Sequence, residues 1–173
     1  MAHRRVRRRP LPQQVLVVCH GNIWRSPYAA AVLRRELSSR GWDSVRVTSA
    51  GLIGPGRPCS DIARAVAITR GLDLSGHRSR VVRPADVEAA DLIVVMDEAQ
   101  RWAILAYGGD GRAVVVLGDL DPDAVETRAI QDPDAQPREV CERSYARIER
   151  CIGELVDALT PSAARRLEVG VGA

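Results

Sequence analysis

The fold is decided by the stretch Val15-Leu-Val-Val-Cys19-His-Gly-Asn-Ile-Trp-Arg25-Ser-Pro27. Its first four residues are an apolar run typical of a buried strand, and apolar residues at helical spacing follow Pro27. Cys19 therefore stands at the first position of a tight turn between a strand and a helix. In such a turn the backbone N–H groups and the positive end of the helix dipole converge on one point. The stretch predicts a binding site for an anion, with a cysteine in it.

The residues after Cys19 indicate which anion this is. Arg25 follows six residues later, and its planar guanidinium can bind two oxygens of a phosphoryl group at once. Arginine and a helix N-terminus both favour the thiolate form of a cysteine, and the Ser26 hydroxyl is placed to donate to the sulfur. Gly21 and Asn22 tolerate the left-handed backbone that a tight anion-binding turn requires. The alternative is an inert, buried cysteine at the end of a strand, with the arginine in solvent.

The composition is typical of one globular domain. The chain has 173 residues, 46% of them hydrophobic, which is enough to bury a core. Residues 1–9 hold five arginines and no acid, so we expect a basic, disordered arm over residues 1–12, a domain over 13–160 and a flexible tail over 161–173. The chain has no lysine. Its arginine content therefore indicates a compositional bias rather than nucleic-acid binding.

Two further features exclude other classes of protein. No apolar stretch is long enough to span a membrane or to form a signal-peptide core, so we expect a cytoplasmic protein. The four cysteines, at positions 19, 59, 141 and 151, include no close pair, which is typical neither of a zinc site nor of a disulfide framework. We expect no metal and no cofactor, because arginine and backbone amides can supply the charge stabilisation.

Strand patterns and helix patterns alternate along the chain. We predict strands over 15–18, 44–49, 91–96 and 113–117, helices over 27–40, 60–70, 84–89, 98–107 and 137–159, and a long loop over 118–136. This alternation predicts an α/β fold with a parallel sheet, helices on both faces and right-handed crossovers. Ligands bind such sheets at the carboxyl ends of the strands, which is where Cys19 lies.

Five motifs occur in the order found in a known family. They are Val18-Cys-His-Gly-Asn-Ile-Trp-Arg-Ser-Pro27, Thr48-Ser-Ala-Gly51, Gly76-His-Arg78, Asp91-Leu-Ile-Val-Val-Met-Asp97 and Asp132-Pro133. Over about residues 13–159 the chain resembles the low-molecular-weight protein tyrosine phosphatases. The resemblance implies a four-stranded, flavodoxin-like three-layer sandwich. It also implies hydrolysis of phosphotyrosine in proteins through a cysteinyl-phosphate intermediate.

The resemblance also implies roles for single residues. Cys19 would be the nucleophile, Arg25 would bind the phosphoryl oxygens and Ser26 would tune the thiolate. Asn22, Ser26, Ser49 and His77 would support the loop through hydrogen bonds. Residues expected to contact substrate are His20, Gly21, Asn22, Ile23, Trp24, Arg25, Ser26 and Leu52.

The chemistry also needs a group that protonates the leaving oxygen and then activates water. Two Asp-Pro pairs are candidates, Asp121-Pro122 and Asp132-Pro133, although Asp-Pro also commonly starts a turn. The resemblance favours Asp132 as the general acid and base. His77 is a rival, but a lone histidine is more often a structural hydrogen-bonding group.

The chain departs from the family pattern at two places. Trp24 stands where many relatives have a second cysteine, so the disulfide that protects the nucleophile is missing unless Cys59 lies within bridging distance. We expect the indole to pack against the sheet or the first helix. The aromatic pocket walls of relatives are also absent, and Leu52, Ile53, Ile23 and Trp24 are expected to supply apolar contact instead.

Two alternative functions remain open. An arsenate reductase on the same fold normally needs resolving thiols downstream, but residues 60–140 contain no cysteine. A non-catalytic phosphate-binding regulatory module would not need Cys19, Arg25 and Asp132 together. For the phosphatase, the implied partner is a tyrosine-phosphorylated protein, and the resemblance to bacterial members points to a tyrosine autokinase.

Overall fold

A computed structural model describes residues 6, 11–123 and 125–159 of the chain. Its sheet has four parallel strands in the order β2-β1-β3-β4. The strands are β1 (Gln14–Cys19), β2 (Arg46–Gly51), β3 (Leu92–Val95) and β4 (Val114–Val116). The predicted parallel α/β sheet is confirmed.

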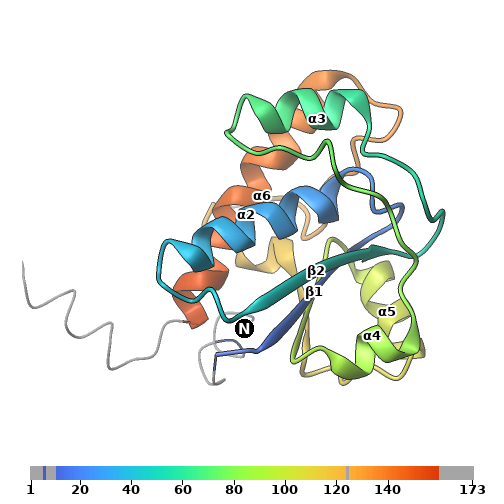
Figure 1. Cartoon of the computed structure of the whole chain (residues 1–173), viewed down its shortest axis with the longest axis vertical. Helices are drawn as coiled ribbons and strands as arrows, with labels where there is room; N and C mark the ends of the chain where they lie inside the picture. The colour runs from blue at the N-terminus through green and yellow to red at the C-terminus, as the bar shows by residue number, and fades with distance from the viewer. Residues whose placement is uncertain (1–5, 7–10, 124, 160–173) are drawn as a thin grey trace, which may run out of the picture.

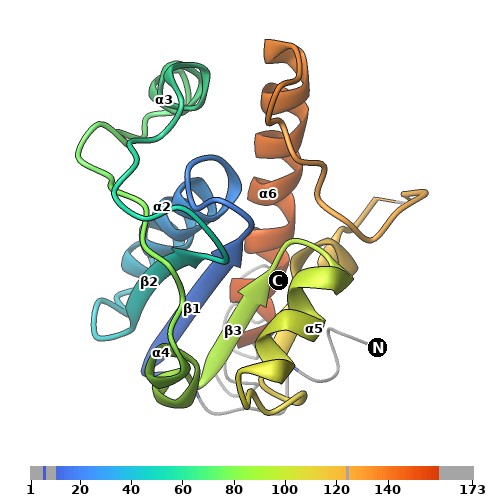
Figure 2. The same cartoon turned by 90° about the vertical axis from the view of Figure 1, so that its right-hand side faces the viewer.

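Helices cover both faces of this sheet. On one face lie α2 (Arg25–Ser38) and α6 (Arg138–Leu159), and on the other lie α4 (Pro84–Ala89) and α5 (Glu98–Ala106) (Figures 1 and 2). The remaining helix, α3 (Asp61–Ile68), contacts α6. The arrangement is the expected three-layer sandwich, with β1 in the middle of the sheet.

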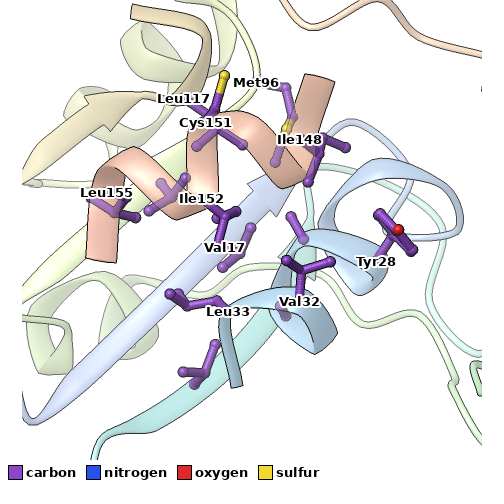
Figure 3. Packing of buried hydrophobic residues seen from close by; sticks show 14 of the residues in the cluster. Val17, Tyr28, Val32, Leu33, Met96, Leu117, Ile148, Cys151, Ile152 and Leu155 are labelled. Carbon is purple, nitrogen blue, oxygen red and sulfur yellow. The ribbon is translucent and has the colours of Figure 1, made fainter. Parts of the chain in front are cut away.

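Alternate residues of the strands belong to two separate cores. Val15 and Val17 of β1 join the larger cluster under α2 and α6, whereas Leu16 and Val18 join the smaller cluster under α4 and α5. Both sets are buried, which explains why the strands are continuously apolar. Figure 3 shows the larger cluster, in which side chains of α6 and α2 meet over Val17.

Most element boundaries differ from the predictions by one or two residues. The second strand occupies 46–51 rather than 44–49, because a turn in which Val45 N–H donates to the Trp42 carbonyl precedes it. The resulting register pairs Cys19 with Gly51. The first helix begins at Arg25, two residues before Pro27. A 3-10 helix, η1 (Leu117–Leu120), occupies the start of the predicted loop.

The ends of the chain are described only in part. Within residues 1–12, Val6 is buried in the larger cluster and Leu11 packs against that cluster, while the disorder of this arm stays a prediction. The predicted tail of residues 161–173 lies outside the described residues. Within the described part of the chain, no helix is long and apolar enough to cross a membrane.

Candidate active site

The loop between β1 and α2 folds around the Cys19 sulfur, and we call residues 19–26 the phosphate loop. Asn22 has a left-handed backbone with φ 52°, and its backbone N–H donates to Cys19 Sγ over 3.3 Å. Gly51 of β2 lies so close that a Cβ there would be 2.9 Å from the His20 carbonyl oxygen. Only glycine fits opposite the cysteine without moving this backbone.

The Ser26 hydroxyl also contacts the sulfur. Its Oγ lies 3.0 Å from Cys19 Sγ and accepts a hydrogen bond from Asn22 Nδ2 over 2.9 Å. Since that bond uses the oxygen as an acceptor, the serine proton has two possible acceptors, the sulfur and the Ala50 carbonyl oxygen. The sulfur is nearer to it than the Ala50 carbonyl oxygen, which lies at 3.3 Å. A hydrogen bond that a hydroxyl donates to the sulfur stabilises the thiolate.

Buried Asn22 connects the phosphate loop to three other segments. Its Nδ2 also donates to Ser49 Oγ over 3.0 Å, and its Oδ1 accepts from the Arg80 backbone N–H over 3.0 Å. Its carbonyl oxygen lies 2.7 Å from His77 Nε2. A carbonyl only accepts, so Nε2 carries the proton. The structure thus brings Asn22, Ser49 and His77 together, and it adds the backbone of Arg80, which no sequence pattern predicts.

Arg25 is buried, with 3% of its surface exposed. Its Nη1 donates to the Ile130 carbonyl oxygen over 3.0 Å and lies 3.7 Å from Asp97 Oδ2, while its Nη2 is paired with Asp132 Oδ2. These contacts orient the guanidinium and leave the Nε–H as a buried donor without a partner among the described residues.

The two candidate acids lie in different places. Asp132 is paired with Arg25 and lines the cavity at Cys19. Asp121 instead accepts from Arg147 Nε over 2.7 Å and from Arg150 Nε over 3.3 Å, and it does not line that cavity. The geometry supports Asp132 over Asp121.

The cavity above the phosphate loop has a volume of about 50 Å³. Half of the expected substrate contacts line it, namely His20, Gly21, Ile23 and Trp24, whereas Asn22, Arg25, Ser26 and Leu52 do not. Leu52 packs against the smaller core cluster, and its neighbour Ile53, 46% exposed, lines the cavity instead. The prediction that Leu52 contacts substrate is wrong, because the backbone bends at Leu52 and Ile53 and directs Leu52 away from the cavity. The lining residues are Cys19, His20, Gly21, Ile23, Trp24, Ile53, Arg57, Asp132 and Asp134.

Three residues of the site were missed by the sequence reasoning. Arg57 lines the cavity and donates to the carbonyl oxygens of Gly21 and Gly54 over 3.0 and 3.1 Å. Asp97 caps α5 through Gln100 N–H and faces Arg25. Asp134 also lines the cavity. Asp97 had a detectable signal, because it directly follows a buried strand at the edge of the sheet where Cys19 lies.

Trp24 is packed as expected, but it also makes a polar contact. The residue belongs to the larger core cluster, and its indole Nε1 donates to Asp134 Oδ1 over 3.1 Å. Cys59 is buried in the same cluster, and burial raises the pKa of its thiol to about 12. In the described part of the chain, no group of three or more His, Cys, Asp and Glu side chains is placed to hold a metal.

Comparison with known proteins shows the family of the chain. A family model, low molecular weight phosphotyrosine protein phosphatase, matches residues 14–165. The probable low molecular weight protein-tyrosine-phosphatase EpsP of Ralstonia solanacearum is 37% identical over 149 residues, which cover 85% of this chain and 93% of that protein. Low molecular weight protein-tyrosine phosphatase A of Mycobacterium tuberculosis is 32% identical over 161 residues, 89% of this chain and 96% of that protein.

A solved structure agrees as well. The tyrosine phosphatase Wzb from Escherichia coli K30, in complex with sulphate, superposes with a TM-score of 0.76 at 27% identity, covering 86% of this chain and 99% of that chain. The family model, the relatives and the fold all lead to the same assignment. The chain is an enzyme that belongs to the low molecular weight phosphotyrosine protein phosphatases.

Proposed function

We propose that this enzyme hydrolyses phosphotyrosine in proteins in two steps, through a phosphoryl group carried on Cys19. The observation that carries the proposal is the set of hydrogen-bond donors and the cavity around the Cys19 sulfur. Cys19 Sγ accepts the Asn22 N–H over 3.3 Å and lies 3.0 Å from the Ser26 hydroxyl, in a cavity that Asp132 also lines. Nucleophile and proposed acid thus face one small volume.

In the first step the Cys19 thiolate attacks phosphorus and the bond to the tyrosine oxygen breaks. Arg25 and the backbone N–H groups of the phosphate loop stabilise the charge on the phosphoryl oxygens. Asp132, protonated, gives its proton to the departing phenolate. In the second step the Asp132 carboxylate takes a proton from water, the water oxygen attacks phosphorus, and the thiolate leaves.

Loss of the nucleophile tests the proposal. Cys19→Ser should abolish turnover of p-nitrophenyl phosphate and of a phosphotyrosine peptide. In the wild type, acid quenching during turnover of a radiolabelled phosphotyrosine peptide should leave label on the protein, and Cys19→Ser should carry none. Residual turnover by Cys19→Ser, or equal turnover of phosphoserine and phosphotyrosine peptides, would contradict the proposal.

The remaining cysteines argue against an arsenate reductase. Burial raises the pKa of Cys141 to about 11 and that of Cys151 to about 12, as it does for Cys59. Such thiols are protonated at neutral pH and are poor resolving nucleophiles. Arsenate-dependent consumption of a reduced dithiol would nevertheless reveal that activity directly.

We further propose that the substrate is a tyrosine-phosphorylated protein, of which a bacterial tyrosine autokinase is the class to test first. We propose that the enzyme acts in the cytoplasm, where a reactive thiolate is kept reduced. Cys19→Ser binds the phosphate without completing the reaction, so it can capture the partner. Recovery of phosphotyrosine proteins by Cys19→Ser, but not by the Cys19→Ser/Arg25→Ala double variant, would support this assignment.

A further inference from the structure

The Trp24 side chain joins the phosphate loop to the segment that carries the proposed acid. We call residues 130–136 the acid loop. Trp24 Nε1 donates to Asp134 Oδ1 over 3.1 Å, a contact between residues 110 positions apart in the chain. Both side chains line the cavity at Cys19. The contact therefore crosses the rim of the active site.

The Trp24 end of this contact is firmly held. Trp24 is 7% exposed and packs in the larger core cluster. Its carbonyl oxygen accepts the Tyr145 hydroxyl over 3.0 Å. Tyr145 is itself stacked on Tyr28 of α2, with ring centroids 3.6 Å apart. The Trp24 backbone is thus bound to α6, and its indole is held by burial in the core cluster.

The Asp134 end is exposed, and it connects directly to the acid. The Asp134 backbone N–H donates to Asp132 Oδ1 over 3.3 Å, while Asp132 Oδ2 is paired with Arg25. The next residue, Ala135, has a left-handed backbone with φ 55°. A side chain bound at Asp134 therefore holds the N–H that orients one oxygen of the Asp132 carboxyl group.

We propose that Trp24 is a positioning residue for the general acid. Its indole N–H holds Asp134, and Asp134 in turn holds the Asp132 carboxyl group where it faces the leaving oxygen. The inference rests on the acid role proposed above for Asp132. In this view the tryptophan does more than fill the space of a smaller side chain, because it couples the position of the acid loop to that of the nucleophile's loop.

The test compares two substrates that differ in their need for an acid. Phenolate leaves poorly without a proton, whereas p-nitrophenolate leaves readily, and kcat/KM reports the step in which either group leaves. Trp24→Phe keeps the ring but removes the donor. We expect it to lower kcat/KM for phenyl phosphate by about three- to tenfold, as for the loss of one hydrogen bond, and for p-nitrophenyl phosphate by less than about twofold. Any change in phosphate binding cancels in the ratio of the two values.

Variants of the partner residue sharpen the test. Asp134→Asn keeps a carbonyl acceptor for the indole and should keep the wild-type ratio. Asp134→Ala should lower the ratio as Trp24→Phe does, and the double variant should be no worse than either single one. Asp134 is exposed, so its variants carry the test if Trp24→Phe fails to fold. Trp102→Phe, at a tryptophan that is 62% exposed on α5, is the matched control and should leave both substrates unchanged.

Asp132→Asn separates the positioning role of Trp24 from the acid role of Asp132. It should lower the ratio more than any Trp24 or Asp134 variant. If it does, and Trp24→Phe and Asp134→Ala leave the ratio unchanged, then Trp24 only packs and the positioning role is overturned alone. If Asp132→Asn leaves the ratio unchanged, then Asp132 is not the acid, and both proposals fail.

Discussion

The two Asp-Pro pairs share a dipeptide but have contrasting surroundings. Asp121 and Asp132 lie eleven residues apart, and each follows the sheet in a connecting segment before α6. The Asp121 side chain is 1% exposed and lies between two arginines, Arg147 and Arg150. The Asp132 side chain is 39% exposed and faces the cavity at Cys19. The same Asp-Pro dipeptide thus supplies one structural carboxylate, Asp121, and one candidate general acid, Asp132.

The difference shows that neighbours decide what a carboxylate does. Burial alone would raise the pKa of Asp121, but hydrogen bonds from Arg150 and Arg147 outweigh it and hold the pKa below its usual 3.8. Asp121 is therefore a permanent anion at neutral pH and has no proton to give. Asp132 has one arginine partner and an open side toward the site where a leaving group would emerge.

The largest expected effect is on catalysis. Asp132→Ala should lower kcat/KM for phenyl phosphate by about 10²- to 10⁴-fold, the usual range for loss of a general acid. Asp121→Ala should stay within about twofold of the wild type, because its carboxylate does not line the cavity. Steady-state kinetics on the two purified variants measures this. Comparable losses in both would show that the contrast between the two loops has no catalytic meaning.

The free energy of unfolding should fall more in Asp121→Ala than in Asp132→Ala, the reverse of the order expected for catalysis. Asp121→Ala leaves Arg147 and Arg150 without their shared acceptor, although Arg147 keeps two backbone carbonyls and Arg150 keeps Asp123. We expect a loss of about 2 kcal/mol in the free energy of unfolding, below the roughly 3–5 kcal/mol for a broken buried pair, because both arginines keep other acceptors. Asp132→Ala should cost less than about 1 kcal/mol, since its side chain is partly exposed and buried Arg25 keeps the Ile130 carbonyl oxygen and Asp97 as partners. Urea unfolding at pH 7 decides between these values, and equal losses would count against the comparison.

The contribution of Asp121 to the free energy of unfolding should be lost in acid. Its folded-state pKa is lowered, so the stability it contributes is fully present above its unfolded-state pKa, about 3.9, and is lost as pH falls through the lower folded-state value. The gap in unfolding free energy between wild type and Asp121→Asn should therefore be constant from pH 7 to about 5 and should shrink below about pH 4. Urea titrations across this range measure the gap. A gap that widens in acid would mean that the arginines do not stabilise the charged form.

Local requirements made the phosphate loop predictable. The loop needs a strand end, a residue that tolerates φ 52°, an arginine and a helix start, and all of these lie within residues 14–27. The strands were recognisable because both faces are buried. The position of β2 was not, because its start depends on the turn at Trp42 and on pairing with β1, neither of which appears in its own residues.

The features of the site that could not be predicted depend on contacts between segments that are distant in the sequence. Nothing around Trp24 reveals that its indole will meet Asp134, and nothing around Arg57 reveals that it will bind the Gly21 carbonyl oxygen. Leu52 and Ile53 are equivalent by composition, and only the path of the backbone puts Ile53 at the cavity. Asn22 and His77 were paired through the family resemblance, not through any pattern in the residues themselves.

The smallest expected effect concerns the support of the phosphate loop, in a pH range where Asp121 does not titrate. His77 Nε2 donates to the Asn22 carbonyl oxygen over 2.7 Å. Burial lowers the pKa of His77 below its usual 6.5, helped by the charges of Arg34 and Arg78, although the bond to Asn22 opposes this. The folded protein therefore resists protonation of this ring more than the unfolded chain does.

The sign of the pH dependence follows from that difference. As pH falls below about 6.5 the unfolded chain binds the proton first, so stability declines until the folded-state pKa is reached and is then constant. The decline should be less than about 1 kcal/mol, because a half-buried ring is partly screened by water. His77→Gln should flatten it in urea titrations at pH 7, 6 and 5. An unchanged slope in the variant would assign the titration to another group, whereas stability that rises in acid would mean that the Asn22 carbonyl oxygen, and not burial, dominates the environment of His77.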